Sequence, residues 1–417
     1  MKPQTASGLF QKILIANRGE IACRIIRTCQ NLGIPTVAVY SEADRDALHV
    51  RLADDAFYIG KATPQDSYLN HERILEIAIR CQADAIHPGY GFLAENDVFA
   101  EACLSKGIHF IGPRPESIRE MGSKSRAKQL MQEAGVPVVP GYHGDKQDFK
   151  ILRNEAEKIG FPLLIKPVAG GGGRGMRVVR QLNELEEALT LSRSEAKNAF
   201  GDDNVLLERF IEGPRHIEFQ IFGDQHGNFV HLHERECSIQ RRHQKILEES
   251  PSPFLDETLR KQMAEASLKA ANAVQYLGAG TVEFIVGEDR SFYFIEMNTR
   301  LQVEHPVTEM RTGLDLVEWQ IRVASGEKLP LDQDQIRPKG HSIEVRVCAE
   351  NPERGFLPSS GLLELYDFPE DPSASGSSLI RLDSGFEQKD RVGIHYDSML
   401  AKLIVHDEDR KKALETI

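Results

Sequence analysis

The amino-acid sequence predicts a mixed α/β and α+β fold, in which a doubly wound parallel-sheet domain is followed by antiparallel strands. Two patterns support this class. Short apolar runs alternate with helix-length spacers in the first third of the chain, and pairs of strand patterns dominate the rest. With 417 residues the chain is too long for one ordinary core, so we expect two or three domains.

Strand patterns and helix-length spacers alternate at the start of the chain. The strand patterns cover 12–16, 36–40, 85–86 and 109–111, and helical periodicity covers 20–32. Such spacing predicts parallel strands, because each crossover returns the chain to the same edge of the sheet. The first turn reads Asn-Arg-Gly-Glu and lacks the glycines of G-x-G-x-x-G, so we exclude a dehydrogenase.

The pattern changes after about residue 122. Helices are expected at 124–134 and 182–199, and strands at 162–166, 205–208, 215–222, 229–236, 281–286 and 291–297. The polar stretch 326–340 predicts a boundary, followed by strands of a third unit at 341–349 and 400–405. Because the chain stops inside a helical pattern, we expect this third unit to be incomplete.

Composition excludes several classes of protein. A formal net charge of −12 argues against nucleic acid as a partner, because phosphate binding favours a basic surface. No apolar stretch approaches the roughly 20 residues of a membrane helix, and the first residues lack the core of a targeting signal. Six scattered cysteines without a C-x-x-C pair predict buried, reduced thiols in a cytoplasmic protein.

A glycine-rich loop, AGGGGRGM at 169–176, follows the strand that carries Lys166. Successive glycines let backbone N–H groups approach phosphate oxygens, and Lys166 supplies a positive charge. The chain has no G-x-x-x-x-G-K-[ST] motif, so this loop is not a P-loop. A plain flexible loop is the alternative.

Two glutamates are expected to face each other across a hairpin. If the hairpin is symmetric about Asp289 and Arg290, Glu283 lies opposite Glu296. Opposed Cβ atoms are about 4.5–5.5 Å apart, so the two carboxylates repel unless a cation lies between them. Asn298 adds a neutral oxygen on the same face, and oxygen ligands favour Mg²⁺. A solvated acidic face is the alternative, and a β-bulge would shift the register.

Polar residues recur at every second position after this pair. In an extended chain they share one face, which then carries Asn298, Arg300, Gln302 and Glu304. Arg300 suits a planar oxyanion held by paired hydrogen bonds, and Glu304 suits proton removal from a small acid. A structural polar network is the alternative.

The basic run SIQRRHQKILEE covers 238–249. His243 and Lys245 are two positions apart, so they lie on one side if the segment is extended. A solvated basic patch is the commoner meaning of such a run.

Six stretches together resemble the biotin carboxylase family along essentially the whole chain. They read KILIANRGEIACRI, HPGYGFLAEN, GGGGRGMRVV, ERFIEGPRHIEFQ, RECSIQRRHQK and FIEMNTRLQVEHPVTEM. The resemblance implies three domains: an N-terminal biotin carboxylase domain at 1–122, an ATP-grasp domain at 123–335 with a mobile lid at about 138–210, and a C-terminal biotin carboxylase domain at 336–417, incomplete here.

The resemblance also implies a role for individual residues. ATP would be bound by Lys124, Lys166, Gly172, Gly173, the hinge Glu208, Arg209, Phe210 and Ile211, and by His216, Gln240 and His243. Mg²⁺ or Mn²⁺ would be held by Glu283, Glu296 and Asn298. Bicarbonate would be bound by Lys245, Arg300, Gln302, Val303 and Glu304, with Glu304 as the base and Arg346 at the ureido oxygen of biotin. Arg209 departs from the lysine that the family often has at this position.

The implied reaction is the first half-reaction of a biotin-dependent carboxylase, with carboxyphosphate as the intermediate. The implied partners are a biotin carboxyl carrier protein or domain, a carboxyltransferase subunit and a second copy of the chain, without nucleic acid or membrane. The chain has no Met-Lys-Met biotinylation site, so biotin is expected on another chain or a further segment. An acyl-CoA carboxylase (acetyl-, propionyl- or methylcrotonyl-CoA) is favoured, but the acceptor stays open.

Two alternative functions remain. They are another ATP-grasp ligase, such as a carbamoyl-phosphate synthetase-like enzyme, and a non-catalytic ATP-binding regulatory subunit.

Overall fold

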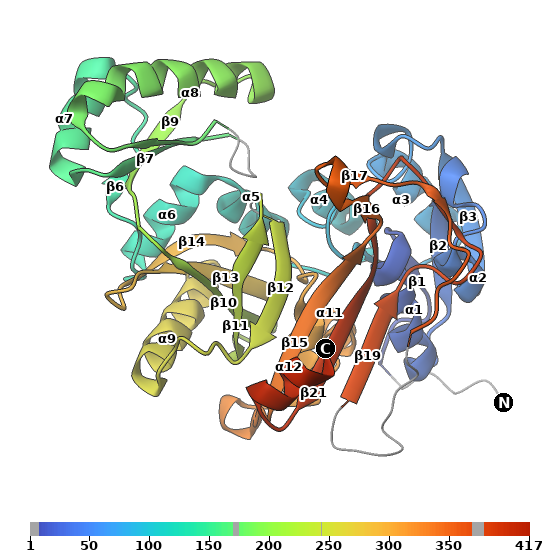
Figure 1. Ribbon diagram of the computed structural model, residues 1–417. Coiled ribbons are helices and arrows are strands. Elements are labelled where there is room, and N and C mark those ends of the chain that lie inside the picture. The colour runs from blue at the N-terminus through green and yellow to red at the C-terminus, as the bar shows by residue number, and fades with distance from the viewer. Residues whose placement is uncertain (1–7, 170–174, 243, 369–378) are drawn as a thin grey trace.

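The computed structural model describes residues 8–169, 175–242, 244–368 and 379–417. Figure 1 shows three parts: an N-terminal α/β unit in blue, a small unit at upper left, and a long sheet between them. Among the described residues, no helix is long and apolar enough to cross a membrane.

The N-terminal unit contains a five-stranded parallel sheet in the order β3-β2-β1-β4-β5. Its strands are β1 (Ile13–Ile15), β2 (Thr36–Ser41), β3 (Asp55–Gly60), β4 (Ala85–His87) and β5 (His109–Phe110). Its helices are α1 (Gly19–Leu32), α2 (Leu48–Leu52), α3 (His71–Arg80), α4 (Asp97–Ser105) and α5 (Pro115–Gly122). Ile13 and Ile15 enter one core, whereas Leu14 enters another, so both sheet faces are covered. The predicted doubly wound sheet is confirmed.

Charged side chains lie just after the first two strands of this sheet. Arg18, which follows β1, donates to Asp44, which follows β2, at 2.6 Å. The Arg18 guanidinium also lies 4.2 Å from the ring centroid of Tyr396, near the end of the chain. These contacts join the N-terminal sheet to the last part of the chain.

An eight-stranded sheet carries most of the remaining chain, in the order β14-β13-β10-β11-β12-β15-β21-β19. Its strands are β10 (Arg215–Gly223), β11 (Phe229–Arg241), β12 (Gln244–Ser250), β13 (Gly278–Val286), β14 (Phe292–Asn298), β15 (His341–Cys348), β19 (Leu379–Ser384) and β21 (Met399–Asp407). Because β12 pairs with β15, this sheet continues across the expected boundary at 326–340. The division into domains stays a prediction.

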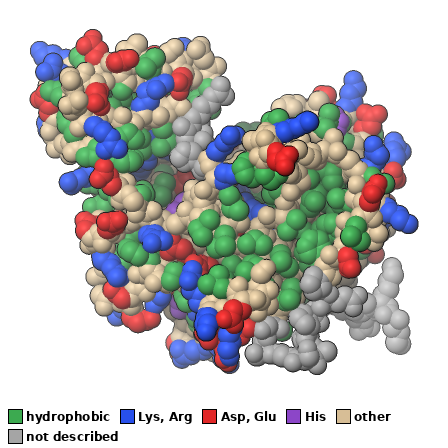
Figure 2. All heavy atoms as spheres, in the orientation of Figure 1, with side chains coloured by type: hydrophobic (Ala, Val, Ile, Leu, Met, Phe, Trp, Pro, Cys, Tyr) green, Lys and Arg blue, Asp and Glu red, His purple; other side chains and the backbone are tan. Residues whose placement is uncertain are grey.

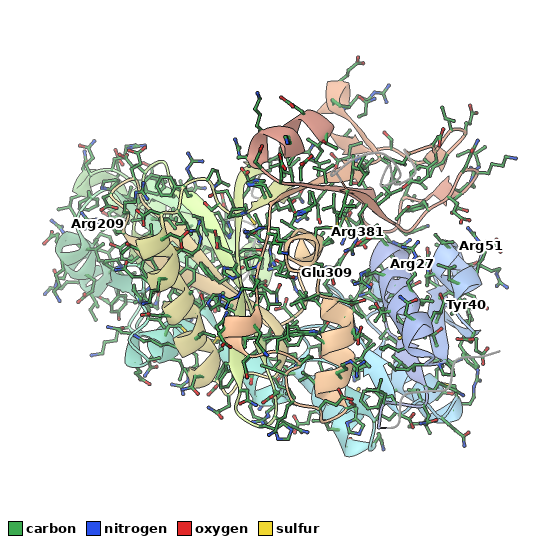
Figure 3. All side chains as sticks on the ribbon, turned by 90° about the horizontal axis from the view of Figure 1, so that it is seen from below. Arg27, Tyr40, Arg51, Arg209, Glu309 and Arg381 are labelled. Carbon is green, nitrogen blue, oxygen red and sulfur yellow. The ribbon has the colours of Figure 1, made fainter. Side chains whose placement is uncertain are left out.

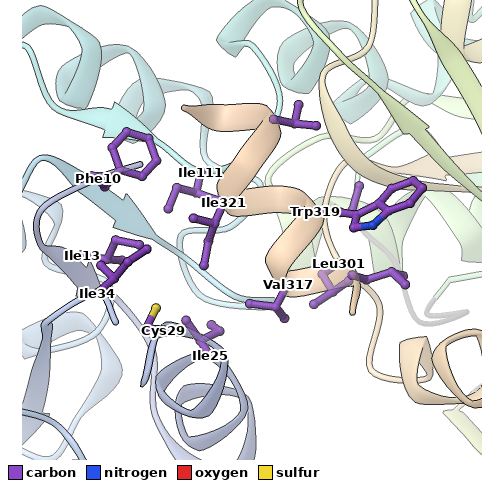
Figure 4. Close-up of a cluster of buried hydrophobic side chains, with 14 of the residues drawn as sticks. Phe10, Ile13, Ile25, Cys29, Ile34, Ile111, Leu301, Val317, Trp319 and Ile321 are labelled. Carbon is purple, nitrogen blue, oxygen red and sulfur yellow. The ribbon is translucent and has the colours of Figure 1, made fainter. Parts of the chain in front are cut away.

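Helices and short strands complete this region. The helices are α6 (Lys124–Glu133), α9 (Glu257–Ala273), α10 (His305–Thr312), α11 (Leu316–Ala324) and α12 (Arg410–Thr416). The short strands are β16 (Glu350–Asn351), β17 (Leu357–Pro358), β18 (Gly361–Leu362) and β20 (Arg391–Val392). Figure 4 shows Val317 and Ile321 of α11 beside Ile25 and Ile111 of the N-terminal unit, and Leu301 belongs to the same core. This packing fixes the loop after β14 against the N-terminal unit.

A smaller sheet forms the unit at upper left in Figure 1, in the order β6-β9-β7-β8. Its elements are β6 (Gly141–Tyr142), α7 (Phe149–Ile159), β7 (Leu163–Pro167), β8 (Arg177–Val179), α8 (Leu185–Phe200) and β9 (Val205–Arg209). Leu152, Ile165, Leu189 and Leu207 give it a core of its own. The unit lies within the predicted lid at 138–210.

The cysteine prediction is partly wrong. Five cysteines are buried free thiols, but Cys348, at the end of β15, is exposed.

Candidate active site

The predicted acidic pair is confirmed on neighbouring strands. Glu283 of β13 lies opposite Glu296 of β14. However, the predicted symmetry of the hairpin is wrong. The Gly287 N–H donates to the Ser291 carbonyl at 2.8 Å, so the loop is centred on Asp289 alone. A register shift after Phe284 then leaves Ile295 unpaired and restores the Glu283–Glu296 pairing. Two deviations from the simple hairpin therefore cancel.

Lys245 joins three buried carboxylates at the centre of the site. Its Nζ lies 2.5 Å from Oε2 of Glu218, 2.9 Å from Oε1 of Glu283 and 2.8 Å from Oε1 of Glu304. Burial alone would lower the pKa of Lys245, but Glu218, Glu283 and Glu304 hold it well above its usual value. The ammonium group is therefore charged at neutral pH.

The two opposed glutamates differ in acidity. Burial would raise the pKa of Glu283, but Lys245 and His216 hold it well below its usual range. The pKa of Glu296 is raised by burial and by the charge of Glu283. A cation between the two carboxylates would remove this repulsion.

The donor set fits a divalent cation. Glu283 and Glu296 present two carboxylates at paired positions of β13 and β14. The side-chain nitrogen of Asn298 lies 2.8 Å from Oε1 of Glu283, so the Asn298 amide lies beside the Glu283–Glu296 pair. Two carboxylates and an amide favour an oxygen-liganded ion such as Mg²⁺ or Mn²⁺.

A polar loop follows this pair. Arg300 donates to Asn298 Oδ1 at 3.1 Å, to Gln302 Oε1 at 3.1 Å and to Glu95 Oε2 of the N-terminal unit at 2.8 Å. Sequence alternation therefore predicted the grouping of Asn298, Arg300 and Gln302 correctly. The expected extended segment is wrong beyond Asn298, because β14 ends there and Glu304 is the N-cap residue of α10.

Glu304 lies between two cations. It contacts Lys245 on one side and NH2 of Arg346 on the other, at 3.2 Å. Burial would raise the pKa of Glu304, but Lys245 and Arg346 hold it well below its usual range. Arg346 is in turn held by Glu248 at 2.5 and 3.0 Å. Burial raises the pKa of Glu248 to about 7.

Lysines gather at the side of the site that faces the small sheet. Nζ of Lys166 lies 2.6 Å from Oε2 of Glu208, and Lys128 pairs with the same buried carboxylate. Burial and the neighbouring charge of Lys124 lower the pKa of Lys166 to about 8. Burial also lowers the pKa of Lys124, although the charge of Glu296 acts to raise it. A cluster of buried ammonium groups suits a phosphate ligand.

Other predicted nucleotide contacts are placed as follows. His216 accepts from Gln240 at 2.9 Å and contacts Glu283 at 2.6 Å, so it lies beside the Glu283–Glu296 pair. Arg209 ends β9, with an exposed side chain at the outer edge of the small unit (Figure 3). Backbone N–H groups of Arg209 and Phe210 donate to Pro140 and Pro162 carbonyls at 2.9 and 3.0 Å, and Ile211 follows. Gly172, Gly173 and His243 lie outside the described residues.

The basic run at 238–249 is not one extended segment. Arg241 of β11 pairs with Gln244 of β12, and Arg242 between them has a φ of +52°. The chain therefore reverses between Arg241 and Gln244, and the expectation of one extended segment is wrong. Lys245 reaches the site from β12 instead.

Glu218 and Glu248 were missed by the sequence analysis. Both are fully buried, and they bind Lys245 and Arg346. An acidic residue inside an otherwise apolar strand was the available signal for Glu218, which lies opposite Glu283 in the sheet. Their partners lie on other strands, so spacing along the chain could not identify the contacts.

Comparisons with known proteins agree with this arrangement. Three family models match: "Biotin carboxylase, N-terminal domain" at 9–118, "Carbamoyl-phosphate synthase L chain, ATP binding domain" at 123–332 and "Biotin carboxylase C-terminal domain" at 344–417. The biotin carboxylase of a Nostoc species is 53% identical over 97% of this chain and 89% of its own length. The mitochondrial methylcrotonoyl-CoA carboxylase subunit alpha of Dictyostelium discoideum is 55% identical over 97% of this chain. This chain spans 57% of that relative's length.

Solved structures give the same result. The biotin carboxylase–β-γ-ATP complex from Campylobacter jejuni has a TM-score of 0.92 and 49% identity, covering 98% of this chain and 90% of that one. The biotin carboxylase domain dimer of Hydrogenobacter thermophilus 2-oxoglutarate carboxylase, with MgADP, ADP and bicarbonate, has a TM-score of 0.91 and 50% identity, covering 98% of this chain and 88% of that one. The chain belongs to the biotin carboxylase family.

Proposed function

We propose that this chain carboxylates biotin, held on a carrier protein or domain, with ATP and bicarbonate as co-substrates. One observation carries the proposal. Lys245 and Glu304 connect the carboxylate pair Glu283–Glu296 to Arg346. The proposed site for metal and nucleotide, the proposed bicarbonate site and the arginine for biotin therefore lie next to one another in this order. Bicarbonate placed at Arg300 and Lys245 would lie between the phosphate donor and the biotin acceptor.

Glu304 is the base in this proposal. In the ligand-free protein its charge is stabilised by Lys245 and Arg346, so it is ionised but weakly basic. An anion bound to the same cations would offset their effect and raise the pKa of Glu304 toward the working pH. The carboxylate would then remove the bicarbonate proton, and the resulting oxyanion would attack the γ-phosphate to give carboxyphosphate and ADP.

The nucleotide-binding part of the site must position the phosphates and neutralise their charge. Lys124 and Lys166 would contact the phosphates, and Glu283, Glu296 and Asn298 would hold Mg²⁺ or Mn²⁺. When bound, the metal supplies charge neutralisation of the phosphate oxygens. Closure of the small unit, as the lid, would exclude water from carboxyphosphate.

Arg346 would stabilise the oxygen that becomes negative when the ureido nitrogen of biotin loses its proton to phosphate. Its guanidinium is available for this task because Glu248, with a pKa of about 7, can become neutral when the arginine turns to biotin. The nitrogen would then take up CO₂ released from carboxyphosphate.

The partners follow from the same proposal. The proposed partners are a biotin carrier, a carboxyltransferase and a second copy of this chain. The methylcrotonoyl-CoA carboxylase relatives support an acyl-CoA carboxylase, and the domain dimer of 2-oxoglutarate carboxylase supports a dimer. Methylcrotonoyl-CoA is the acceptor named in the relatives with 55% identity. A cytoplasmic location stays a prediction from the cysteines.

Carbamoyl-phosphate synthetase is the rival that shares the middle family model. Two biotin carboxylase models flank it here, and Arg346 lies in the second. The test is ATP hydrolysis by the full-length protein, measured with and without bicarbonate and with free biotin. We expect hydrolysis to require bicarbonate and to rise with biotin. Hydrolysis stimulated instead by ammonia, or nucleotide binding without turnover, would refute the proposal.

A further inference from the structure

The loop that carries the anion subsite is held from behind by a buried lysine. Lys402 of β21 is fully buried, and its Nζ donates to the Val303 carbonyl at 2.8 Å. The same ammonium lies 3.2 Å from Glu20 of α1 and 3.8 Å from Asp383 of β19. A single buried charge therefore connects the N-terminal unit, the last strands and the loop before α10.

A buried histidine holds the preceding carbonyl. His305 is fully buried, and its Nδ1 lies 2.8 Å from the Gln302 carbonyl oxygen. Nε2 has no hydrogen-bond partner in the described part of the chain. Burial and the charge of Lys402 hold the pKa of His305 well below its usual value, so the ring is neutral. A neutral ring that contacts a carbonyl through Nδ1 carries its proton there and donates.

The two contacts fix the direction of two backbone N–H groups. The peptide bonds on either side of Val303 are trans, and in a trans peptide the C=O and the N–H point in opposite directions. His305 holds the Gln302 carbonyl, and Lys402 holds the Val303 carbonyl. The N–H groups of Val303 and Glu304 therefore point away from the clamp. Neither donates to an acceptor among the residues that the structure describes.

We propose that His305 and Lys402 are positioning residues, which aim the N–H groups of Val303 and Glu304 at the bound bicarbonate. The inference rests on the proposed function, in which Val303 and Glu304 already bind bicarbonate, and it adds the two residues that orient their backbone. Preorganised N–H donors stabilise an oxyanion without reorganisation during the reaction. The Gln302 carbonyl also accepts from the His305 N–H at 3.3 Å, so losing the His305 ring loosens this peptide plane but does not release it. Removing either side-chain contact should therefore lower the affinity for bicarbonate and leave the nucleotide site unchanged.

His305 offers the cleaner test, because the ring is neutral. Lys402 faces Glu20, Glu344 and Asp383, so its removal leaves buried carboxylates unpaired and risks unfolding. His305→Asn keeps a donor near the position of Nδ1, and His305→Leu removes it. His49 is a matched control: it is fully buried, contacts the Val39 carbonyl at 3.3 Å and lies in the N-terminal unit.

The measurement is bicarbonate binding to the full-length protein by calorimetry, with Mg²⁺ and a non-hydrolysable ATP analogue present. We expect His305→Leu to weaken bicarbonate binding about ten-fold, or about 1.4 kcal/mol. His305→Asn and His49→Leu should bind it within about two-fold of the wild type, and affinity for the analogue should be unchanged throughout. Lys402→Met, if it folds, should match His305→Leu.

The outcomes separate the two claims. If His305→Leu binds bicarbonate as tightly as the wild type, His305 does not position the backbone. The same conclusion follows if His305→Leu and His305→Asn weaken bicarbonate binding equally. A wild type that binds bicarbonate without hydrolysing ATP refutes the proposed function, yet the His305 pair still decides the clamp. A wild type that binds no bicarbonate overturns both.

Discussion

Nζ of Lys245 lies 2.8 Å from Oε1 of Glu304, although the two residues are 59 positions apart in the chain. The contact joins β12 to the N-cap residue of α10, and the same ammonium also contacts Glu283. Lys245 thereby couples the proposed metal ligands to the proposed base.

Lys245→Met is expected to change the pH dependence of the reaction. Without its charge the pKa of Glu304 rises, because burial is then opposed mainly by Arg346. Below that pKa the base is protonated, so the acid limb of kcat/KM for bicarbonate should move to higher pH, with a loss of about 100-fold at neutral pH. Steady-state ATP hydrolysis from pH 6 to 9 measures this. If the acid limb of the variant stays at the wild-type pH, Lys245 does not control the pKa of Glu304.

Glu296→Gln is expected to raise the Mg²⁺ requirement. The variant keeps the shape of the side chain but removes one of the two opposed carboxylates. A lost charged ligand should raise the Mg²⁺ concentration for half-maximal activity by about ten-fold or more. The same substitution at Glu288, in the exposed turn of the hairpin, is the control. Identical metal titrations for Glu296→Gln and wild type would exclude Glu296 as a ligand.

Local patterns predicted the strands better than the contacts between them. Short apolar runs correctly located β10, β13 and β14, and most residues of β10 and β13 are buried on both faces. The Glu283–Glu296 pairing was also correct, but only because a bulge offset the wrong turn. Register depends on turn geometry, which one sequence specifies weakly.

The contacts that complete the site come from sheet neighbours far apart in the chain. Glu248 meets Arg346 because β12 pairs with β15, and the apparent boundary at 326–340 concealed that pairing. Arg381 of β19 contacts Glu309 of α10 at 2.7 Å, and Figure 3 shows the two labelled side by side. No spacing rule predicts such partners. Side-chain types suggested the chemistry, and only the fold defines which groups meet.

Hydrophobic side chains form a broad green area on the face that Figure 2 shows. Phe356 and Ile239 are among the large apolar side chains exposed on the chain. Arg346→Ala should reduce carboxylation of free biotin about 100-fold or more. Bicarbonate-dependent ATP hydrolysis should fall much less, because Lys245 still lowers the pKa of Glu304. The fold should tolerate the change, because Glu248 has a pKa of about 7 and can become neutral. Arg241→Ala, which removes an arginine bound to Glu350, is the matched control. Equal loss of hydrolysis and carboxylation would contradict a role at biotin.

Asp44→Asn tests the Arg18–Asp44 ion pair of the N-terminal unit. Burial would raise the pKa of Asp44, but its hydrogen bond with Arg18 and the charge of Arg18 lower it. A carboxyl with a lowered pKa stabilises the fold above its unfolded pKa of about 3.9, and this stability is lost as the pH falls through the folded value. The variant should therefore lose about 1–3 kcal/mol of unfolding free energy at pH 7. Urea unfolding should show a constant difference down to about pH 5 that narrows below about pH 4. The exposed variant Asp46→Asn should stay within about 0.5 kcal/mol of wild type. A difference that already narrows between pH 7 and pH 5 would show that another group, and not Asp44, supplies the stability.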